Sequence, residues 1–264
     1  MRPGERNTFA PDSATVRAEP TSVVRRVSEI LGAFGHEDRA LGVNEIARRT
    51  GIPKATVSRL VAELVDEGML ERHGAQIVLG LRLFELGERA SRRRSMREVA
   101  LPFLADLRAA TGQTVHLAVL DGSEVVYVEI LRGRGGPTLP SGVGLRLPAH
   151  ATGVGKALLA AAPPDVLQRI LERGLAPVGP RTITAPGALL AHLRRIAASG
   201  MSYEHEESAA GVACVASAIV PDGGPAVGAV SATGWIGKVD IRRVGPAVRT
   251  TALTIARELA AAEP

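Results

Sequence analysis

Basic and small polar side chains gather on one short segment between residues 48 and 59. That segment contains no Asp or Glu, and its polar residues are Arg48, Arg49, Thr50, Lys54, Thr56, Ser58 and Arg59. Guanidinium and ammonium groups bind phosphate, and an arginine can also read the edge of a guanine through paired hydrogen bonds. The segment therefore has the chemistry needed to bind nucleic acid.

The spacing around this segment predicts a helix-turn-helix that would position these side chains. Ala47 is followed by Gly51 and then by Val57. A small residue lets two helices approach, a glycine tolerates positive φ in the turn, and the apolar residue anchors the second helix. We expect helices over 43–50 and from Pro53 onward. The core face of the second helix is predicted from its apolar spacing, as Val57, Leu60, Val61 and Leu64.

A helix over 22–34 and a β-hairpin of 69–72 with 76–79 complete a winged helix-turn-helix. Its outward face carries the expected DNA contacts: Arg48, Arg49, Lys54, Ala55, Thr56, Ser58, Arg59, Arg72 and His73. We expect Arg59 to read a base, because it points away from the apolar stripe. Arg48, Arg49 and Lys54 are expected to hold phosphates, and Arg72 or His73 on the wing to reach a neighbouring groove.

The pattern changes after residue 112. Segments 114–120 and 124–131 alternate around Asp121-Gly122, and 211–220 with 226–233 read as a second hairpin. Helices are expected over 152–162, 164–173, 186–199 and 241–261, and a Gly-rich loop over 132–148. The predicted class is α+β: a flexible tail (1–20), a winged helix-turn-helix (21–80), a helical linker (81–96) and an α/β domain with a mostly antiparallel sheet (97–264).

Composition excludes several functional classes. The chain has 264 residues, 45% of them hydrophobic, and a net charge of +5. No stretch approaches the roughly 18 apolar residues of a membrane helix. The single cysteine and the histidine spacing offer no disulfide and no metal cluster, so we expect no metal and no cofactor. Residues 1–20 lack the apolar core of a secretory signal, so we expect a cytoplasmic protein.

Three segments resemble the IclR family of bacterial transcriptional regulators. They are the winged helix (Val43–Ala47 with Lys54–Leu60), Leu147–Ala160, and Gly200–Ser208 with Gly211–Ala216. The resemblance covers about residues 20–262. It implies a DNA-binding domain, a linking helix and a GAF-like effector domain. It also implies dimers, often paired into tetramers, and a small organic effector, an acid or another polar metabolite, that alters binding to operator DNA.

The resemblance also implies an effector site: Gly153, Val154, Glu204, Cys214, Ser231 and Thr233. Two features of the sequence agree with it. Ser231 and Thr233 lie two apart on a predicted strand and so share a face. Gly153 and Val154 open a predicted helix, whose free N–H groups suit a carboxylate or another acceptor.

Other readings of these residues stay open. Cys214 with His205 could form a thiol hydrolase site, but the alternation around Cys214 favours a buried and inert thiol. Gly155-Lys156 lacks the remainder of a phosphate-binding loop. His116 faces either the pocket or solvent, and Trp235 either lines the pocket or closes the core. The acidic run 204–207 is either a solvated loop or, through Glu204, part of the site.

We therefore predict an effector-responsive DNA-binding transcriptional regulator, with repression favoured over activation and no enzymatic activity. The alternatives are a cysteine-based hydrolase with a winged-helix appendage and a module that binds only protein.

Overall fold

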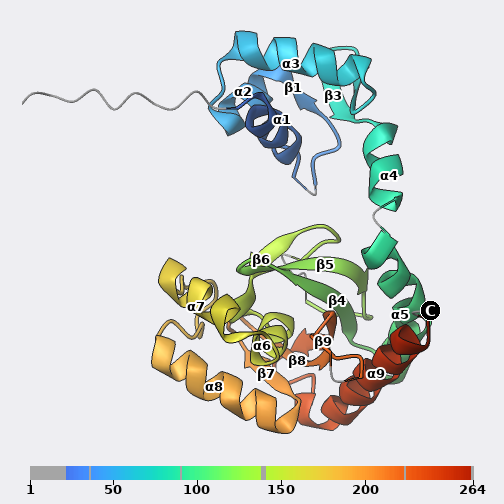
Figure 1. Cartoon of the computed structure of the whole chain (residues 1–264), viewed down its shortest axis with the longest axis vertical. Coiled ribbons are helices and arrows are strands. Elements are labelled where there is room, and N and C mark those ends of the chain that lie inside the picture. The colour runs from blue at the N-terminus through green and yellow to red at the C-terminus, as the bar shows by residue number, and fades with distance from the viewer. Residues whose placement is uncertain (1–21, 36, 90, 138–140, 223, 263–264) are drawn as a thin grey trace, which may run out of the picture. The chain divides into compact units, whose positions relative to one another are not determined.

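The computed structural model describes residues 22–262, apart from 36, 90, 138–140 and 223 (Figure 1). The expected tail at 1–20 lies outside the described residues. The chain divides into two compact units at Gly87/Glu88. Each unit is described by itself below. The unit up to Gly87 is called the head, and the unit from Glu88 onward is called the effector unit.

The head has the predicted helix-turn-helix and wing. Its helices are α1 (Val23–Gly32), α2 (Val43–Thr50), α3 (Lys54–Asp66) and α4 (Leu81–Glu88). Its strands are β1 (Leu41–Gly42), β2 (Leu70–His73) and β3 (Gln76–Leu79), in the antiparallel order β1-β3-β2. The predicted helices and hairpin are confirmed to within a few residues. The short strand β1 was not predicted, because two residues carry no periodicity.

The turn between α2 and α3 has the expected chemistry. Gly51 adopts φ 70°, a left-handed conformation that favours glycine, and its N–H bonds the carbonyl of Ala47 at 2.9 Å. The buried side chains of α3 are the predicted stripe of Val57, Leu60, Val61 and Leu64. They join a core that also contains Ile30, Ile46, Leu70 and Ile77. The rotation of α3 about its axis is therefore fixed.

The effector unit is built on a six-stranded antiparallel sheet in the order β6-β5-β4-β9-β8-β7. The strands are β4 (Thr114–Asp121), β5 (Glu124–Leu131), β6 (Arg146–Pro148), β7 (Ser202–His205), β8 (Val212–Ile219) and β9 (Gly228–Trp235). The helices are α5 (Ser91–Thr111), the 3-10 turn η1 (Ala149–Ala151), α6 (Gly153–Ala160), α7 (Pro164–Arg173), α8 (Pro186–Ser199) and α9 (Ile241–Ala262). The predicted α+β class with an antiparallel sheet is confirmed.

Alternation along the strands divides the side chains between two cores. Val115, Leu117 and Val119 of β4 pack with α5 and α9 on one face of the sheet. Ala118 of β4 and Tyr127 of β5 belong to the other core, with α6, α7 and α8. Figure 1 shows the helices on both faces of the sheet. This placement puts the N-terminus of α6 over the middle strands.

The structure refines three expectations for single elements. The helical linker predicted over 81–96 consists of α4, which ends at Glu88, and the start of α5, which begins at Ser91 and continues through Pro102. The loop predicted over 132–148 ends in strand β6, which pairs with β5. Of the two readings left open for the acidic run, the solvated loop does not hold for Glu204, which lies in strand β7 opposite Cys214 of β8.

Two glycines let α6 approach the structure beneath it. A Cβ at Gly153 would stand 2.7 Å from Sγ of Cys214, and one at Gly155 would stand 2.1 Å from the carbonyl oxygen of Ala149. Both separations are shorter than van der Waals contact. Only glycine therefore allows the first turn of α6 to lie this close to β8 and η1.

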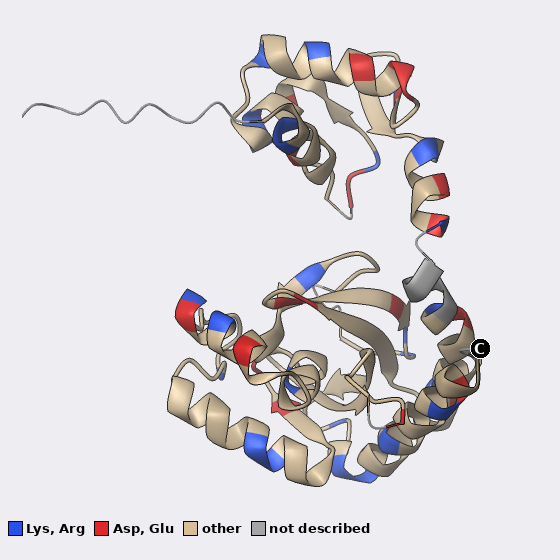
Figure 2. Cartoon of the chain, in the orientation of Figure 1, with Lys and Arg blue, Asp and Glu red and all other residues tan. Residues whose placement is uncertain are grey.

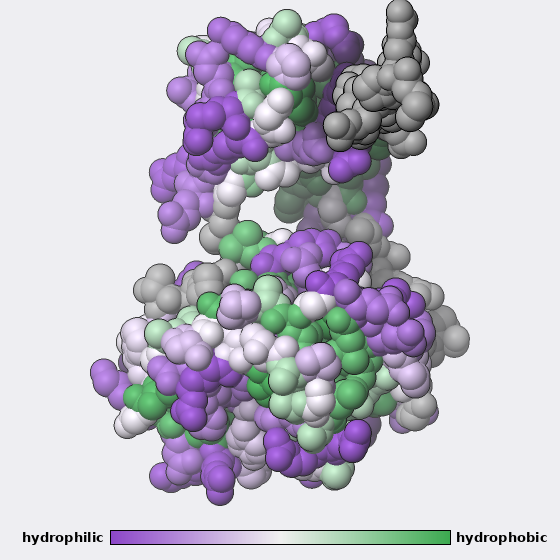
Figure 3. Space-filling model, turned by 90° about the vertical axis from the view of Figure 1, so that its left-hand side faces the viewer, coloured by the Kyte–Doolittle hydropathy of each residue, from purple (hydrophilic) through white to green (hydrophobic). Residues whose placement is uncertain are grey.

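No helix in the described part of the chain combines the length and apolar character needed to span a bilayer. On the face drawn in Figure 3, each unit shows many hydrophilic residues with apolar residues exposed among them. The largest exposed apolar side chains of the head include Leu81 and Phe84 of α4, 63% and 65% exposed.

Candidate functional site

The outer face of α3 carries the residues predicted to contact DNA. Lys54, Ala55, Ser58 and Arg59 are exposed and Thr56 is half-buried, while the intervening apolar residues are in the core. Figure 2 shows basic residues on the N-terminal half of α3 and acidic residues on its C-terminal half. Arg59 donates to Glu63 one turn later at 2.6 Å. Because both side chains are more than half exposed, this pair is an open surface contact.

The wing residues Arg72 and His73 are also exposed, at the end of β2. His73 lies 3.6 Å from Glu71, with 66% of the histidine side chain exposed. Both residues thus stand on the hairpin that follows α3, as predicted, without a buried role.

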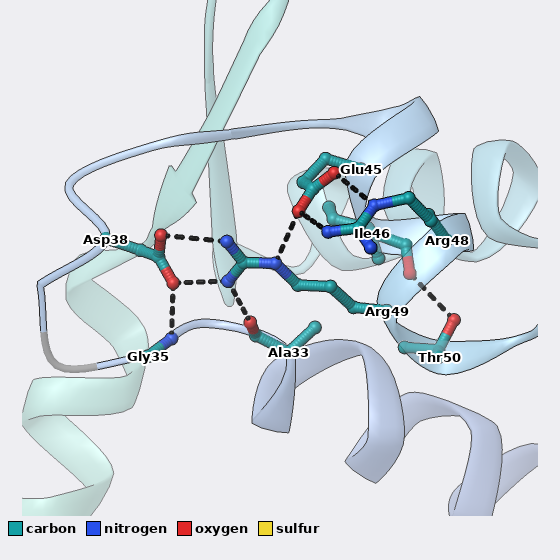
Figure 4. A network of polar contacts seen from close by, with 8 residues as sticks. All are labelled: Ala33, Gly35, Asp38, Glu45, Ile46, Arg48, Arg49 and Thr50. Atoms are coloured by element: carbon teal, nitrogen blue, oxygen red, sulfur yellow. Dashed lines mark hydrogen bonds and ion pairs between the residues drawn. The ribbon is translucent and has the colours of Figure 1, made fainter.

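Arg48 and Arg49, adjacent in sequence, occupy different environments (Figure 4). The Arg49 guanidinium contacts both carboxylate oxygens of Asp38, donates to the carbonyl of Ala33 at 3.0 Å and donates through Nε to Glu45 at 2.7 Å. Hydrogen bonds from Arg49 and Gly35 lower the pKa of Asp38, and those from Arg48 and Arg49 lower the pKa of Glu45 to about 2. Arg49 therefore fastens the segment between α1 and α2 to α2.

Arg48 lies on the outside of the same network. It forms a paired contact with Glu45, at 2.9 Å and 2.7 Å, but its side chain is 73% exposed, against 32% for Arg49. Sequence reasoning treated the two arginines alike, because Asp38 lies far from them along the chain and its contact depends on the fold.

The effector unit encloses a small polar cavity between the N-terminus of α6 and the sheet. Its wall contains all the residues that the sequence pointed to for effector binding, together with others: His116, Tyr127, Ser141, Leu147, Thr152, Gly153, Val154, Glu204, Ser208, Cys214, Ser231 and Thr233. About 20 Å³ is open to the centre of a water molecule, which is room for about one ordered water. A larger ligand must displace side chains from this space.

The strand register brings the polar wall residues together. Thr233 of β9 pairs with Cys214 of β8, and Cys214 pairs with Glu204 of β7. Directly opposed residues of adjacent strands point to the same face of a sheet. The row Thr233–Cys214–Glu204 therefore crosses three strands beneath α6. His116 of β4 lies opposite Ser231 in the neighbouring row.

His116 contacts three hydroxyl groups of the cavity wall. Its Nδ1 lies 3.2 Å from Oγ of Ser231 and 3.5 Å from Oγ1 of Thr233, and its Nε2 lies 3.3 Å from Oγ of Ser141. Burial, with a smaller effect of Arg132, lowers the pKa of His116 to about 4. The imidazole is thus neutral at physiological pH and offers one donor and one acceptor. It faces the cavity rather than solvent.

Glu204 and Cys214 are both buried in the wall. Burial raises the pKa of Glu204 to about 7, against the opposing effect of hydrogen bonds from the backbone N–H groups of Ser208 and Glu207. Burial, with the nearby Glu204, raises the pKa of Cys214 to about 12. The thiol therefore stays protonated at neutral pH, which disfavours it as a nucleophile. His205, its suggested partner, is exposed.

Sequence reasoning missed several wall residues. They come from five different segments: β5 (Tyr127), a loop (Ser141), β6 (Leu147), the start of α6 (Thr152) and the turn after β7 (Ser208). Thr152 could have been found, because it caps α6 by accepting from the N–H of Gly155 at 3.0 Å. The others carry no local signal, since strand order brings them together. Trp235 was expected in the pocket or the core, but it is 37% exposed and forms no part of the wall.

An exposed helix with a basic N-terminal half in one unit and a small cavity lined by polar side chains in the other are typical of a DNA-binding protein that responds to a small ligand. The family comparisons agree. The family model described as the IclR helix-turn-helix domain matches residues 23–74, and the one described as the C-terminal region of the bacterial transcriptional regulator IclR matches residues 89–257. The chain belongs to the IclR family and is a transcriptional regulator with a C-terminal effector-binding domain.

Individual relatives carry related names. The HTH-type transcriptional regulator XynR of Escherichia coli K12 is 33% identical over 196 residues, covering 73% of this chain and 78% of XynR. The HTH-type transcriptional repressor AllR of the same strain is 29% identical over 98% of this chain and 95% of AllR. A crystal structure of an IclR homolog from Microbacterium hydrocarbonoxydans, complexed with 4-hydroxybenzoate, superposes with a TM-score of 0.85 at 32% identity. It covers 91% of this chain and 100% of that one.

The neutral, buried His116 predicts a dependence of stability on pH. Below about pH 6.5 the unfolded chain binds a proton at this histidine, whereas the folded protein binds it only near pH 4. Stability is therefore lost as pH falls through this window, by up to about 3 kcal/mol for a shift of this size. His116→Gln, which keeps a donor and an acceptor, should be less sensitive to acid in urea unfolding at pH 7.5 and 4.5.

The matched control is His205→Gln, because His205 is exposed. Glu204 titrates with the opposite sign in part of the same range, so the comparison is between each variant and the wild type rather than between absolute values. An equal acid sensitivity of wild type and His116→Gln would contradict the neutral imidazole.

Proposed function

We propose that this regulator acts as a dimeric, cytoplasmic repressor whose effector is a small carboxylate bound in the cavity of the effector unit. The observation that carries the proposal is the composition of the cavity wall. The first N–H groups of α6, at Gly153 and Val154, have no acceptor within the helix, and both residues line the cavity. Such N–H groups suit one oxygen of a carboxylate.

The opposite side of the wall supplies complementary groups. Ser231 and Thr233 are held by His116 and can each donate to a ligand oxygen, while Tyr127, Leu147 and Val154 offer apolar surface. A flat carboxylic acid with an apolar body matches this arrangement of polar and apolar contacts. The relative solved with 4-hydroxybenzoate makes that compound the first probe.

For DNA binding, we propose that Arg59 reads a base edge while Ala55, Thr56 and Ser58 line the same surface. Arg48 and Lys54 would hold phosphates, with Arg72 and His73 reaching the next groove from the wing. The Arg49 guanidinium is already hydrogen-bonded to Asp38, Ala33 and Glu45. It would therefore add positive charge near the phosphates rather than bind one directly. The N-terminal end of α3, where no acid lies, favours contact with the negatively charged backbone.

Repression is the simpler outcome of operator binding, since it needs no contact with RNA polymerase. The name of AllR, a repressor, adds support. The effector would act by binding one arrangement of the two heads more tightly than the other, and its effect on DNA binding cannot exceed that difference in affinity. We propose no catalytic role for Cys214, because its thiol is buried and protonated.

The first test is Arg59→Ala in binding to the operator, sought in the DNA that flanks the gene. Loss of a base-reading arginine should weaken specific binding by about 1–3 kcal/mol, roughly 5- to 150-fold. The matched control is Arg169→Ala, since Arg169 is an exposed arginine of α7 that also pairs with an acid one turn away. Assays at two salt concentrations with nonspecific competitor separate base reading from charge. Unchanged affinity in Arg59→Ala would mean that the recognition face is placed wrongly.

The effector site is tested by combining Ser231→Ala with Thr233→Val, which removes two hydroxyls at nearly constant volume. Operator binding should persist, while release by 4-hydroxybenzoate or by a responsive acid from a carboxylate screen is lost. Fluorescence anisotropy of labelled operator DNA measures both properties in one titration. A normal response of the double variant would remove these hydroxyls from the site.

Dimer formation is proposed through α4, whose apolar side chains are exposed. Leu79, Leu81 and Phe84 border a groove at the start of this helix and are 48%, 63% and 65% exposed. Monomeric proteins rarely leave a contiguous apolar patch open to water. A second copy is the natural occupant, because a near-palindromic operator needs two heads about one helical turn, ~10 base pairs, apart.

Phe84→Glu tests this interface without disturbing the core of the head, since the ring is exposed. In the proposed dimer the partner would bury this phenyl ring, and losing that burial costs about 1.5–3 kcal/mol of association free energy. The dimer dissociation constant should therefore rise at least about tenfold, and operator binding should weaken with it. Sedimentation velocity measures the first effect. Arg82→Gln, on the same helix, should leave the dimer intact. A dimer of unchanged strength in Phe84→Glu would place the interface elsewhere.

A further inference from the structure

A buried charge cluster lies beneath the effector cavity. Lys156 of α6 is fully buried, and its Nζ contacts Oε1 of Glu207 and lies 3.5 Å from the carbonyl oxygen of Tyr203. The Glu207 side chain is 8% exposed, and its Oε2 has no hydrogen-bond partner among the described residues. Lys156 thus pairs with Glu207, which does not line the cavity. On the pKa of Glu204 the two charges act in opposite directions, since Lys156 lowers it and Glu207 raises it.

Glu204 is the second carboxyl group of this cluster and does line the cavity. Its Oε1 accepts from the backbone N–H of Glu207 at 2.7 Å, the backbone N–H of Ser208 at 3.1 Å and the hydroxyl of Ser208 at 3.3 Å. Glu204 and Glu207 are thus linked through a short turn. Gly179 and Thr182 hold that turn in place by donating to the carbonyl of Glu207, at 2.9 Å and 2.7 Å.

The cluster has one cation for two carboxyl groups. Burying an uncompensated charge is costly, so a buried group without a partner takes up or loses a proton instead. The other titratable groups around it supply no second cation: His116 of β4 and His192 of α8 have pKa values lowered to about 4, mainly by burial. Tyr127 of β5 and Cys214 of β8 keep their protons, because burial raises both pKa values. Arg132, which acts on His116, is not part of the cavity wall.

We propose that Lys156 and Glu207 are positioning residues: in their ion pair Glu207 offsets the lysine charge, so that Glu204 holds a proton near neutral pH and presents its O–H group to the effector. The proton sits on Oε2, since Oε1 accepts the three hydrogen bonds from the turn. This assignment deepens the proposed function, on which it rests for the class of effector.

A neutral Glu204 determines which ligands the cavity accepts. An O–H group donates to a carboxylate, whereas an ionised Glu204 would repel it in a space that has no lysine or arginine in its described wall. The effector anion is then bound only by the protonated form of the site. Burial raises the pKa of Glu204 to about 7, so affinity for a carboxylate should fall above that pH, by up to about tenfold per pH unit.

The test observes the Glu204 carboxyl group directly, without effector or DNA. The full-length protein is labelled with ¹³C at the glutamate Cδ positions, and the resonance lost in Glu204→Gln assigns the residue. In the wild type this resonance should titrate near pH 7. Glu207→Gln removes the carboxylate that raises the pKa of Glu204 and leaves the lowering effect of Lys156 uncompensated. In this variant the titration midpoint of Glu204 should therefore move down toward the ordinary glutamate range.

A double variant separates this electrostatic role from a structural one. Lys156→Met with Glu207→Gln removes the cation together with its partner, so it leaves no unpaired charge and Glu204 should still titrate near the wild-type midpoint. Glu172→Gln, on the exposed side of α7, is the control that should change nothing in the Glu204 titration. If Glu207→Gln fails to fold, the wild type and the double variant still decide the matter.

Three results would overturn the proposal. They are an ordinary glutamate midpoint for Glu204 in the wild type, an unmoved midpoint in folded Glu207→Gln, and a fall of a unit or more in the double variant. All three are measured on the protein without effector or DNA. A failure here is therefore distinguishable from a failure of the proposed regulator function, which the anisotropy assays measure separately.

Discussion

The close seating of α6 on the sheet is the contact on which the effector unit depends. Gly153 and Gly155 bring the first turn of the helix against Cys214 of β8 and Ala149 of η1. The helix amides, the hydroxyls of the middle strands and the carboxyl group of β7 then face one small space. A side chain at either glycine would push the helix outward and separate these groups, so packing and ligand chemistry share one requirement.

The head depends on a different constraint, the rotation of α3. Its apolar stripe is buried, so the opposite face must lie outside, and Gly51 sets the angle at which the chain enters the helix. The Arg49 network ties the preceding segment to α2 through Asp38 and Glu45. Arg49 thus stabilises the fold of the head, whereas the side chain of its neighbour Arg48 is mostly exposed to solvent.

Charge balance connects the two sides of the effector cavity. Buried ionisable groups keep their ordinary charge only when a partner is available. Lys156 has such a partner in Glu207, whereas no described cation forms an ion pair with Glu204. The hydrogen bonds that the turn donates to Glu204 hold its position without neutralising it. The polar groups of this cavity are therefore buried next to one another with an ion pair on only one side.

The sequence alone determined the elements whose signals are local. The stripe of α3, the left-handed Gly51 and the alternation of β4, β5, β8 and β9 follow from periodicity and backbone sterics, and the resemblance pointed to Glu204 and its companions. Only the tertiary structure decided that Arg49 forms an ion pair with Asp38, that His116 contacts the hydroxyl of Ser231, and that Lys156 forms an ion pair with Glu207. Each of these contacts joins residues distant in the chain, so strand order and helix packing, which no local pattern encodes, determine which charges and hydroxyls meet.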